Sequence, residues 1–90
     1  MKIIDADVHL SATPGAGRLT CDEILAEMEK SGVDGAVCWP MLTYTRDVAP
    51  DNTAVSEAGK LYPGRIIPFG GLNPMLGLEH TRKELDRCVS

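Results

Sequence analysis

The segment IIDADVH, residues 3–9, decides the fold of this 90-residue chain and holds its first candidate site. A short apolar run near the first residue ends in an acid-x-acid-x-His pattern. Side chains alternate between the two faces of a β-strand, so Asp5, Asp7 and His9 are predicted to point to the same side. Carboxylates are seldom buried unless they are paired or bind a cation. A divalent metal is one explanation, since carboxylate and imidazole both bind zinc, manganese or iron. An acid–histidine hydrogen bond at a strand end, or simple solvent exposure, is the other.

Length and composition describe a single small soluble domain covering residues 1–90. The formal net charge is -4 and 43% of the residues are hydrophobic. This mild acidity, with no cluster of Lys and Arg and no series of aromatic residues, argues against a nucleic-acid partner. No apolar run approaches the roughly 20 residues of a membrane span, and we therefore expect no membrane partner.

The cysteines indicate the compartment. Cys21, Cys38 and Cys88 are odd in number and widely spaced, with no C-x-x-C pair. This pattern is typical of free thiols in a reducing compartment rather than of a disulfide framework. Acidic residues begin at Asp5, which leaves no apolar core for a signal peptide. The predicted location is the cytoplasm.

Strands alternate with helices along the chain. Thr20 and Glu23 fit a capping box at the start of the first helix, Gly32 fits the glycine that ends it, and Asp51 is the predicted cap of the second. The first strand lacks a clean alternation of polar and apolar residues, which favours burial on both faces. The strands are predicted at about residues 2–8, 34–39 and 65–72, and the helices at about 20–31, 51–62 and 77–90.

The third helix and third strand carry further expectations. Leu78, Leu85 and Val89 are predicted to face inward from the helix, while His80 is predicted to lie on the surface. Pro68 falls within the third strand and favours a strand start or an unpaired position there.

This order predicts an α/β fold with parallel strands. The strand-to-helix loops after His9 and Trp39 are each about ten residues long, against a typical 2–6 for such units. Long loops on one side mark the active-site rim of α/β folds, at the carboxyl ends of the strands. Asp7 and His9 fall on that rim. Trp39 also falls at a strand end, where it would form a pocket wall or take part in ordinary packing.

Several motifs, in order, resemble the amidohydrolase superfamily of metal-dependent (β/α)8-barrel enzymes. The resemblance is to the amidohydrolase-related branch, which also holds non-oxidative decarboxylases. IDADVHL at residues 4–10 looks like the family's I-D-x-H-x-H-L metal motif on strand one. YPGR at 62–65 and FGGLNP at 69–74 are similar to the family's approach to strand three and its end. ELDRC at 84–88 looks like the helix that follows.

The resemblance implies a metal site and a pocket. Asp7 stands where the family has its first histidine, and His9 matches the second, so both are the expected metal ligands. The related decarboxylases commonly have an acidic residue at the first position. The implied cofactor is a divalent metal ion, zinc first, with manganese or iron as alternatives. Trp39 and Asn73 would line the mouth and bind substrate; for Asn73, capping the strand end is an equal alternative.

The resemblance also implies a larger protein. The family's remaining ligands and proton-transfer groups lie on later strands, so no catalytic acid or base is assigned here. Three βα units cannot close an eight-stranded barrel, and the chain is therefore expected to be the amino-terminal fragment of a TIM barrel. The expected function is a metal-dependent hydrolase acting on a small carbonyl or carboxylate substrate. The alternatives are a non-oxidative decarboxylase, that is a carboxy-lyase, and a catalytically inert assembly fragment. Exposed edges favour a homo-oligomer or a complementing chain as partner.

Overall fold

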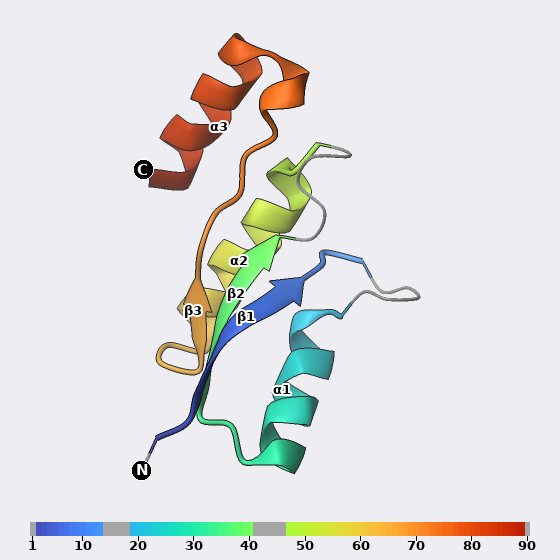
Figure 1. The fold of residues 1–90 in the computed structure, drawn as a ribbon, viewed down its shortest axis with the longest axis vertical. Coiled ribbons are helices and arrows are strands. Elements are labelled where there is room, and N and C mark those ends of the chain that lie inside the picture. The colour runs from blue at the N-terminus through green and yellow to red at the C-terminus, as the bar shows by residue number, and fades with distance from the viewer. Residues whose placement is uncertain (1, 14–18, 41–46, 90) are drawn as a thin grey trace.

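The computed structural model describes residues 2–13, 19–40 and 47–89. Three parallel strands form one open sheet in the order β1-β2-β3 (Figure 1). The strands are β1 (Ile4–Leu10), β2 (Gly35–Pro40) and β3 (Ile66–Pro68). The helices are α1 (Cys21–Ser31), α2 (Ala49–Leu61) and α3 (Leu78–Val89), with a short 3₁₀ helix η1 (Pro74–Leu76) before α3. The predicted α/β class with parallel strands is confirmed.

Local sequence explains the bounds of α1. The hydroxyl of Thr20 accepts the backbone N–H of Glu23, and the carboxylate of Glu23 accepts the backbone N–H of Thr20, as the predicted capping box requires. The same hydroxyl also donates to this carboxylate at 3.0 Å. Gly32 has φ 72°, and its backbone N–H donates to the carbonyl of Met28. This left-handed conformation favours glycine, which therefore ends the helix as predicted.

Three elements have other bounds than predicted. The first strand runs over Ile4–Leu10 instead of about 2–8, so that His9 belongs to β1. The second helix begins at Ala49, not at Asp51, because Pro50 is well suited to the first turn of a helix. The carboxylate of Asp51 instead accepts the backbone N–H of Ala12, 2.9 Å away, and ties the end of β1 to α2.

The third strand ends at Pro68 rather than near residue 72. Pro68 is the last residue of β3 and pairs in register with Cys38, so the prediction of a strand start or an unpaired position at this proline is wrong. The backbone N–H of Phe69 still donates to the carbonyl of Cys38 at 3.0 Å.

The hydrophobic core lies between the sheet and the two helices α1 and α2. Ile24 and Met28 of α1 and Val55 and Ala58 of α2 pack on one face of the sheet. The sheet contributes Leu10, Ala36, Cys38 and Ile66 to this core. Since alternate residues of a strand point to opposite faces, Val37 and Ile67 lie on the other face, which we call the open face. Both are only partly buried.

The expectation that β1 is buried on both faces is wrong for this chain. Ile4 is 53% exposed, and most of the strand is exposed with it. β1 is an edge strand and one of its faces belongs to the open face. The expected inward positions of Leu78, Leu85 and Val89 are wrong as well, with exposures of 72%, 46% and 74%. No helix among residues 2–13, 19–40 and 47–89 combines the length and the apolar character needed to cross a bilayer.

Candidate metal centre

Asp7 and His9 lie together near the carboxyl end of β1. His9 pairs in register with Trp39 of β2, so both belong to the open face of the sheet. The Oδ1 atom of Asp7 lies 3.3 Å from Nε2 of His9. Their side chains are 79% and 50% exposed, respectively. The structure thus brings the two predicted ligands into contact on an accessible surface.

A bulge in β1 separates Asp5 from this pair. The register shifts between Asp5 and Val8, where β1 has one residue more than β2. Asp5 therefore points to the face covered by α1, where it lines a shallow depression with Val8 and Ile24. The prediction that Asp5 shares a face with Asp7 and His9 is wrong. Asp5 still supports the site indirectly, because its Oδ1 accepts the backbone N–H of Asp7 at 3.0 Å.

The backbone of β2 orients the imidazole of His9. Nδ1 of His9 lies 3.3 Å from the carbonyl oxygen of Pro40. In the tautomer with a proton on Nδ1, the ring donates to that carbonyl and leaves the lone pair on Nε2, on the side of Asp7. A backbone carbonyl holding one ring nitrogen while the other binds a metal is a common arrangement in metal sites.

Trp39 lies beside this pair. Its Nε1–H donates to the carbonyl of Ala6 at 3.4 Å, which fixes the indole against the bulged part of β1. Its ring contacts the ring of Phe69, with centroids 4.8 Å apart and planes tilted by 53°. The geometry thus combines a possible pocket wall with ordinary aromatic packing. Phe69, which the sequence did not single out as a site residue, is 46% exposed and continues this wall.

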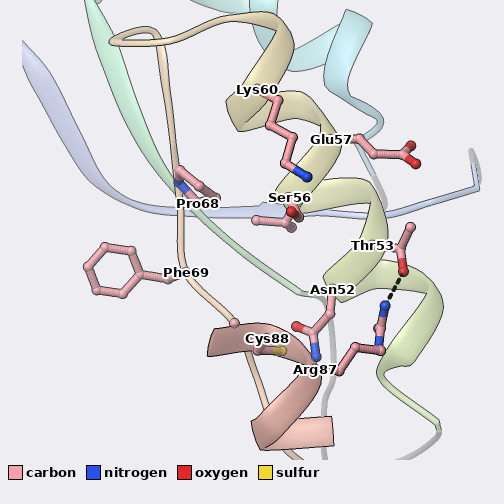
Figure 2. Close-up of a pocket in the computed structure, with 11 residues that line it drawn as sticks. Asn52, Thr53, Ser56, Glu57, Lys60, Pro68, Phe69, Arg87 and Cys88 are labelled. Carbon is pink, nitrogen blue, oxygen red and sulfur yellow. Dashed lines mark hydrogen bonds between the residues drawn. The ribbon is translucent and has the colours of Figure 1, made fainter. Parts of the chain in front are cut away.

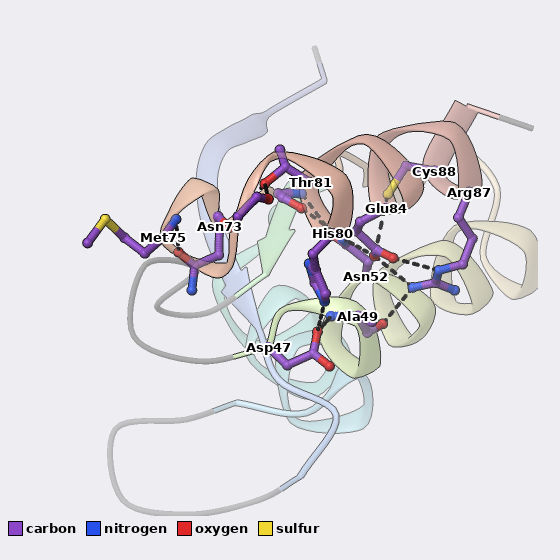
Figure 3. A network of polar contacts seen from close by, with 12 residues as sticks. Asp47, Ala49, Asn52, Asn73, Met75, His80, Thr81, Glu84, Arg87 and Cys88 are labelled. Atoms are coloured by element: carbon purple, nitrogen blue, oxygen red, sulfur yellow. Dashed lines mark hydrogen bonds and ion pairs between the residues drawn. The ribbon is translucent and has the colours of Figure 1, made fainter.

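Asn73 lies with a different group of residues. It is 3% exposed, and its Oδ1 accepts the backbone N–H of Met75 at 3.1 Å, so it caps η1 (Figure 3). The hydroxyl of Thr81 in α3 lies 3.4 Å from the backbone carbonyl of Asn73. The side chain therefore has a capping role, at the start of η1 rather than at the end of β3.

A buried polar network joins α3 to α2 (Figure 3). Glu84 is 5% exposed, and its carboxylate accepts hydrogen bonds from Nδ2 of Asn52 at 2.6 Å and from Arg87 at 2.8 Å. Arg87 also donates to Thr53 and to the carbonyl of Ala49. The pKa of Glu84 is lowered, mainly because Arg87 donates hydrogen bonds to the carboxylate; burial acts in the opposite direction and raises the pKa.

Sequence reasoning missed this network. The side-chain amide of Asn52 also donates to the carbonyl of Gly71 and accepts the backbone N–H of Gly71, both at 2.8 Å. It thereby satisfies both backbone groups of Gly71, as a paired strand would. The contacts join residues far apart in the chain, and no local pattern marks them. His80, predicted to lie on the surface, is partly exposed and lies 3.6 Å from Asp47.

A separate groove is lined by residues of α2 and α3 and by Phe69 (Figure 2). It has a volume of about 390 Å³ and runs between α2, the segment after β3 and the end of α3. Its lining is mixed, with the lysine amine of Lys60, the hydroxyls of Thr53 and Ser56, and the thiol of Cys88. None of the predicted site residues lines this groove.

The chemistry of the Asp7–His9 pair fits part of a metal site. Two ligands of one tetrahedral ion, each bonded at about 2.1 Å, lie about 3.4 Å apart. The observed 3.3 Å between Oδ1 and Nε2 is close to this separation. Across residues 2–13, 19–40 and 47–89, however, no group of three or more His, Cys, Asp or Glu side chains is placed to hold an ion. The described residues therefore supply two ligands, and a complete site needs more.

Comparison with known proteins leaves the family open. No family model, no curated protein and no solved structure matches this chain.

Proposed function

We propose that Asp7 and His9 are two ligands of the divalent metal ion of a hydrolase acting on a small carbonyl or carboxylate substrate. The observation that supports this most directly is the pairing of Oδ1 and Nε2 at 3.3 Å on the open face of the sheet. The position agrees with the general placement of active sites at the carboxyl ends of parallel strands. Zinc is the first candidate ion, with manganese or iron as alternatives.

The bound ion would activate a water molecule or polarise a carbonyl group. The residues of this chain would hold the ion and shape the approach to it. Asp7 contributes negative charge, and Pro40 keeps the imidazole of His9 oriented. Trp39 and Phe69 form a wall on the same face, against which an apolar part of the substrate would pack. Asn73 caps η1 and would act on the site only by fixing the segment after β3.

Decarboxylation is the second candidate reaction. The specific observation in its favour is Asp7, a carboxylate at the position where the resembling hydrolases have a histidine. An acidic residue at this position is common in the related carboxy-lyases. In that reaction the ion would bind the carboxylate of the substrate, and the same wall would hold the remainder of the molecule.

We further propose that the sheet is part of a (β/α)8 barrel. Both edge strands and the open face remain accessible, and additional βα units would cover them and supply the missing ligands. These units would come from a complementing chain or from an oligomer. The three cysteines are free thiols, which supports a reducing compartment such as the cytoplasm. If nothing completes the sheet, the chain is a catalytically inert assembly fragment.

Metal titration of the full 90-residue chain tests the proposal. Co²⁺ absorbance and Zn²⁺ calorimetry are expected to show one weak site, because two protein ligands are fewer than the three of usual catalytic zinc sites. His9→Ala and Asp7→Asn are each expected to weaken binding by more than about tenfold, since even outer-shell changes cost 10–100-fold. His80→Ala is the matched control, because this second histidine also lies near an aspartate, Asp47.

Two results would contradict the proposal. Equal Zn²⁺ affinities of wild type and His9→Ala would show that the ion occupies another site. The absence of binding to wild type at millimolar Zn²⁺ would show that the Asp7–His9 contact is only an ion pair.

A further inference from the structure

The helix α3 has two faces of opposite character. His80, Glu84 and Arg87 face α2 and make the polar contacts described above (Figure 3). Leu78, Leu85 and Val89 fall on an arc of about 40°, roughly opposite Arg87, because successive residues of a helix are about 100° apart. Their exposures of 72%, 46% and 74% show that no described residue covers them. In Figure 1 this stripe belongs to a helix at one end of the molecule.

Two charged residues accompany the stripe. Arg82 falls about 20° beyond Val89, just outside this arc, and Asp86 falls on the same flank of the helix, about 60° beyond Val89 and one turn further along. Both are exposed, and neither forms an ion pair with a residue in the part of the chain that the structure describes. The other charges of α3 differ, because Glu79 pairs with Lys83 and Glu84 pairs with Arg87. This flank of the stripe therefore presents one cation and one anion, one helical turn apart, that form no ion pair within the part of the chain that the structure describes.

From this pattern we infer that the outer face of α3 pairs with the same face of a second copy of the chain, in antiparallel orientation. A two-fold axis between Lys83 and Glu84 sets Leu78 level with Val89 of the second copy. The same axis brings Arg82 level with Leu85 and Asp86 of the second copy. The leucine stripes then meet while two reciprocal Arg82–Asp86 ion pairs form at the edge. The surface is complementary to itself, as a two-fold interface requires.

Orientation follows from the charges. A parallel two-fold pairing would put the flanks of the two copies on opposite edges of the interface, where neither Arg82 nor Asp86 would meet an opposite charge of the second copy. Met75 and Leu76 of η1, 82% and 41% exposed, extend the apolar surface beyond the start of α3. One helix and one turn per copy bury less than the roughly 1,200 Å² of stable complexes, so the dimer is weak and reversible. It does not depend on the metal site.

Sedimentation equilibrium of the full chain tests this inference. Wild type is expected to show a reversible monomer–dimer equilibrium. Arg82→Asp and Asp86→Arg each place like charges across the two-fold axis and are expected to raise the dissociation constant at least about tenfold. The double variant R82D/D86R restores opposite charges and is expected to recover wild-type association. Lys83→Asp makes the same change of charge on the same helix, outside the stripe, and is expected to leave the dimer intact.

A second variant keeps the test independent of the charges. Val89→Lys places a cation at the end of the stripe and is expected to weaken the dimer, with helicity verified by circular dichroism. A wild type that stays monomeric up to millimolar concentration would overturn the inference. So would a dimer that is indifferent to Arg82→Asp and Val89→Lys, since it would form through another surface such as the open sheet. Failure of the double variant to recover association would overturn the proposed orientation.

Discussion

Glu84 is a buried carboxylate whose stability contribution depends on pH. Its folded-state pKa is lowered, chiefly by the hydrogen bond from Arg87. A lowered pKa means that the contribution is fully present above the unfolded carboxyl pKa of about 4.3 and is lost as pH falls through the folded value. We therefore expect Glu84→Gln to reduce the free energy of unfolding by about 1–3 kcal/mol at pH 7, and by less at pH 3.

Urea denaturation at both pH values measures this difference. Glu79→Gln is the matched control, because Glu79 is an exposed glutamate of the same helix that pairs with Lys83. Its effect is expected to stay within about 0.5 kcal/mol. An equal loss for Glu84→Gln at pH 7 and pH 3 would show that the buried network does not depend on the charge of Glu84.

Single residues also show where sequence reasoning reaches and where it stops. Thr20, Glu23 and Gly32 act within one helix, so their roles could be predicted from spacing alone. The direction of Asp5 could not, because the bulge in β1 depends on how β1 aligns with β2. The same holds for the Asn52–Glu84 contact, which joins two helices. The contact between Asp7 and His9 could be predicted, because side chains two residues apart in a strand point to the same face.

At the scale of elements, α2 and β3 approach so closely that only glycine fits between them. A Cβ atom at Gly59 would lie 2.6 Å from Cγ and 2.8 Å from Cδ of Pro68. Replacing a helical glycine by alanine normally stabilises by roughly 1 kcal/mol. Here we expect Gly59→Ala to destabilise by about 1–3 kcal/mol, because the proline ring cannot move aside without shifting β3.

Thermal denaturation followed by circular dichroism measures this change, with Ser56→Ala as the control in the same helix. Ser56 is exposed, and alanine there is expected to be neutral or slightly stabilising. If Gly59→Ala raised the melting temperature as an ordinary helical alanine does, the close contact between α2 and Pro68 would not exist in solution.

For the molecule as a whole, the order of elements was predictable because hydrophobic periodicity and caps are local. The position of α3 was not. Its apolar residues suggested an inward face, yet the helix docks on α2 through Glu84 and Arg87 and leaves Leu78 and Val89 exposed. A periodic stripe predicts which residues share a face, and tertiary contacts decide what that face meets. The same holds for the open face of the sheet beside the Asp7–His9 pair: the sequence predicts which residues share this face but not what the face meets.

These contacts imply that the molecule does not open as one unit. β2 lies between two strands and packs against two helices, whereas α3 is held to α2 largely by the polar contacts of Glu84 and Arg87. Regions with few buried apolar contacts open at lower free energy than the core. We therefore expect amides of residues 36–38 to exchange with solvent most slowly and those of α3 faster. The measurement is hydrogen exchange with mass spectrometry, at concentrations too low for association.

Glu84→Gln separates local from global opening in the same experiment. The substitution removes an acceptor that α2 and α3 share, so exchange in α3 is expected to accelerate. Residues 36–38 have their contacts in the core of Ile24, Val55 and Ile66, and their exchange is expected to change much less. If both regions accelerated by the same factor, α3 would unfold together with the sheet, and the polar network would stabilise the whole domain.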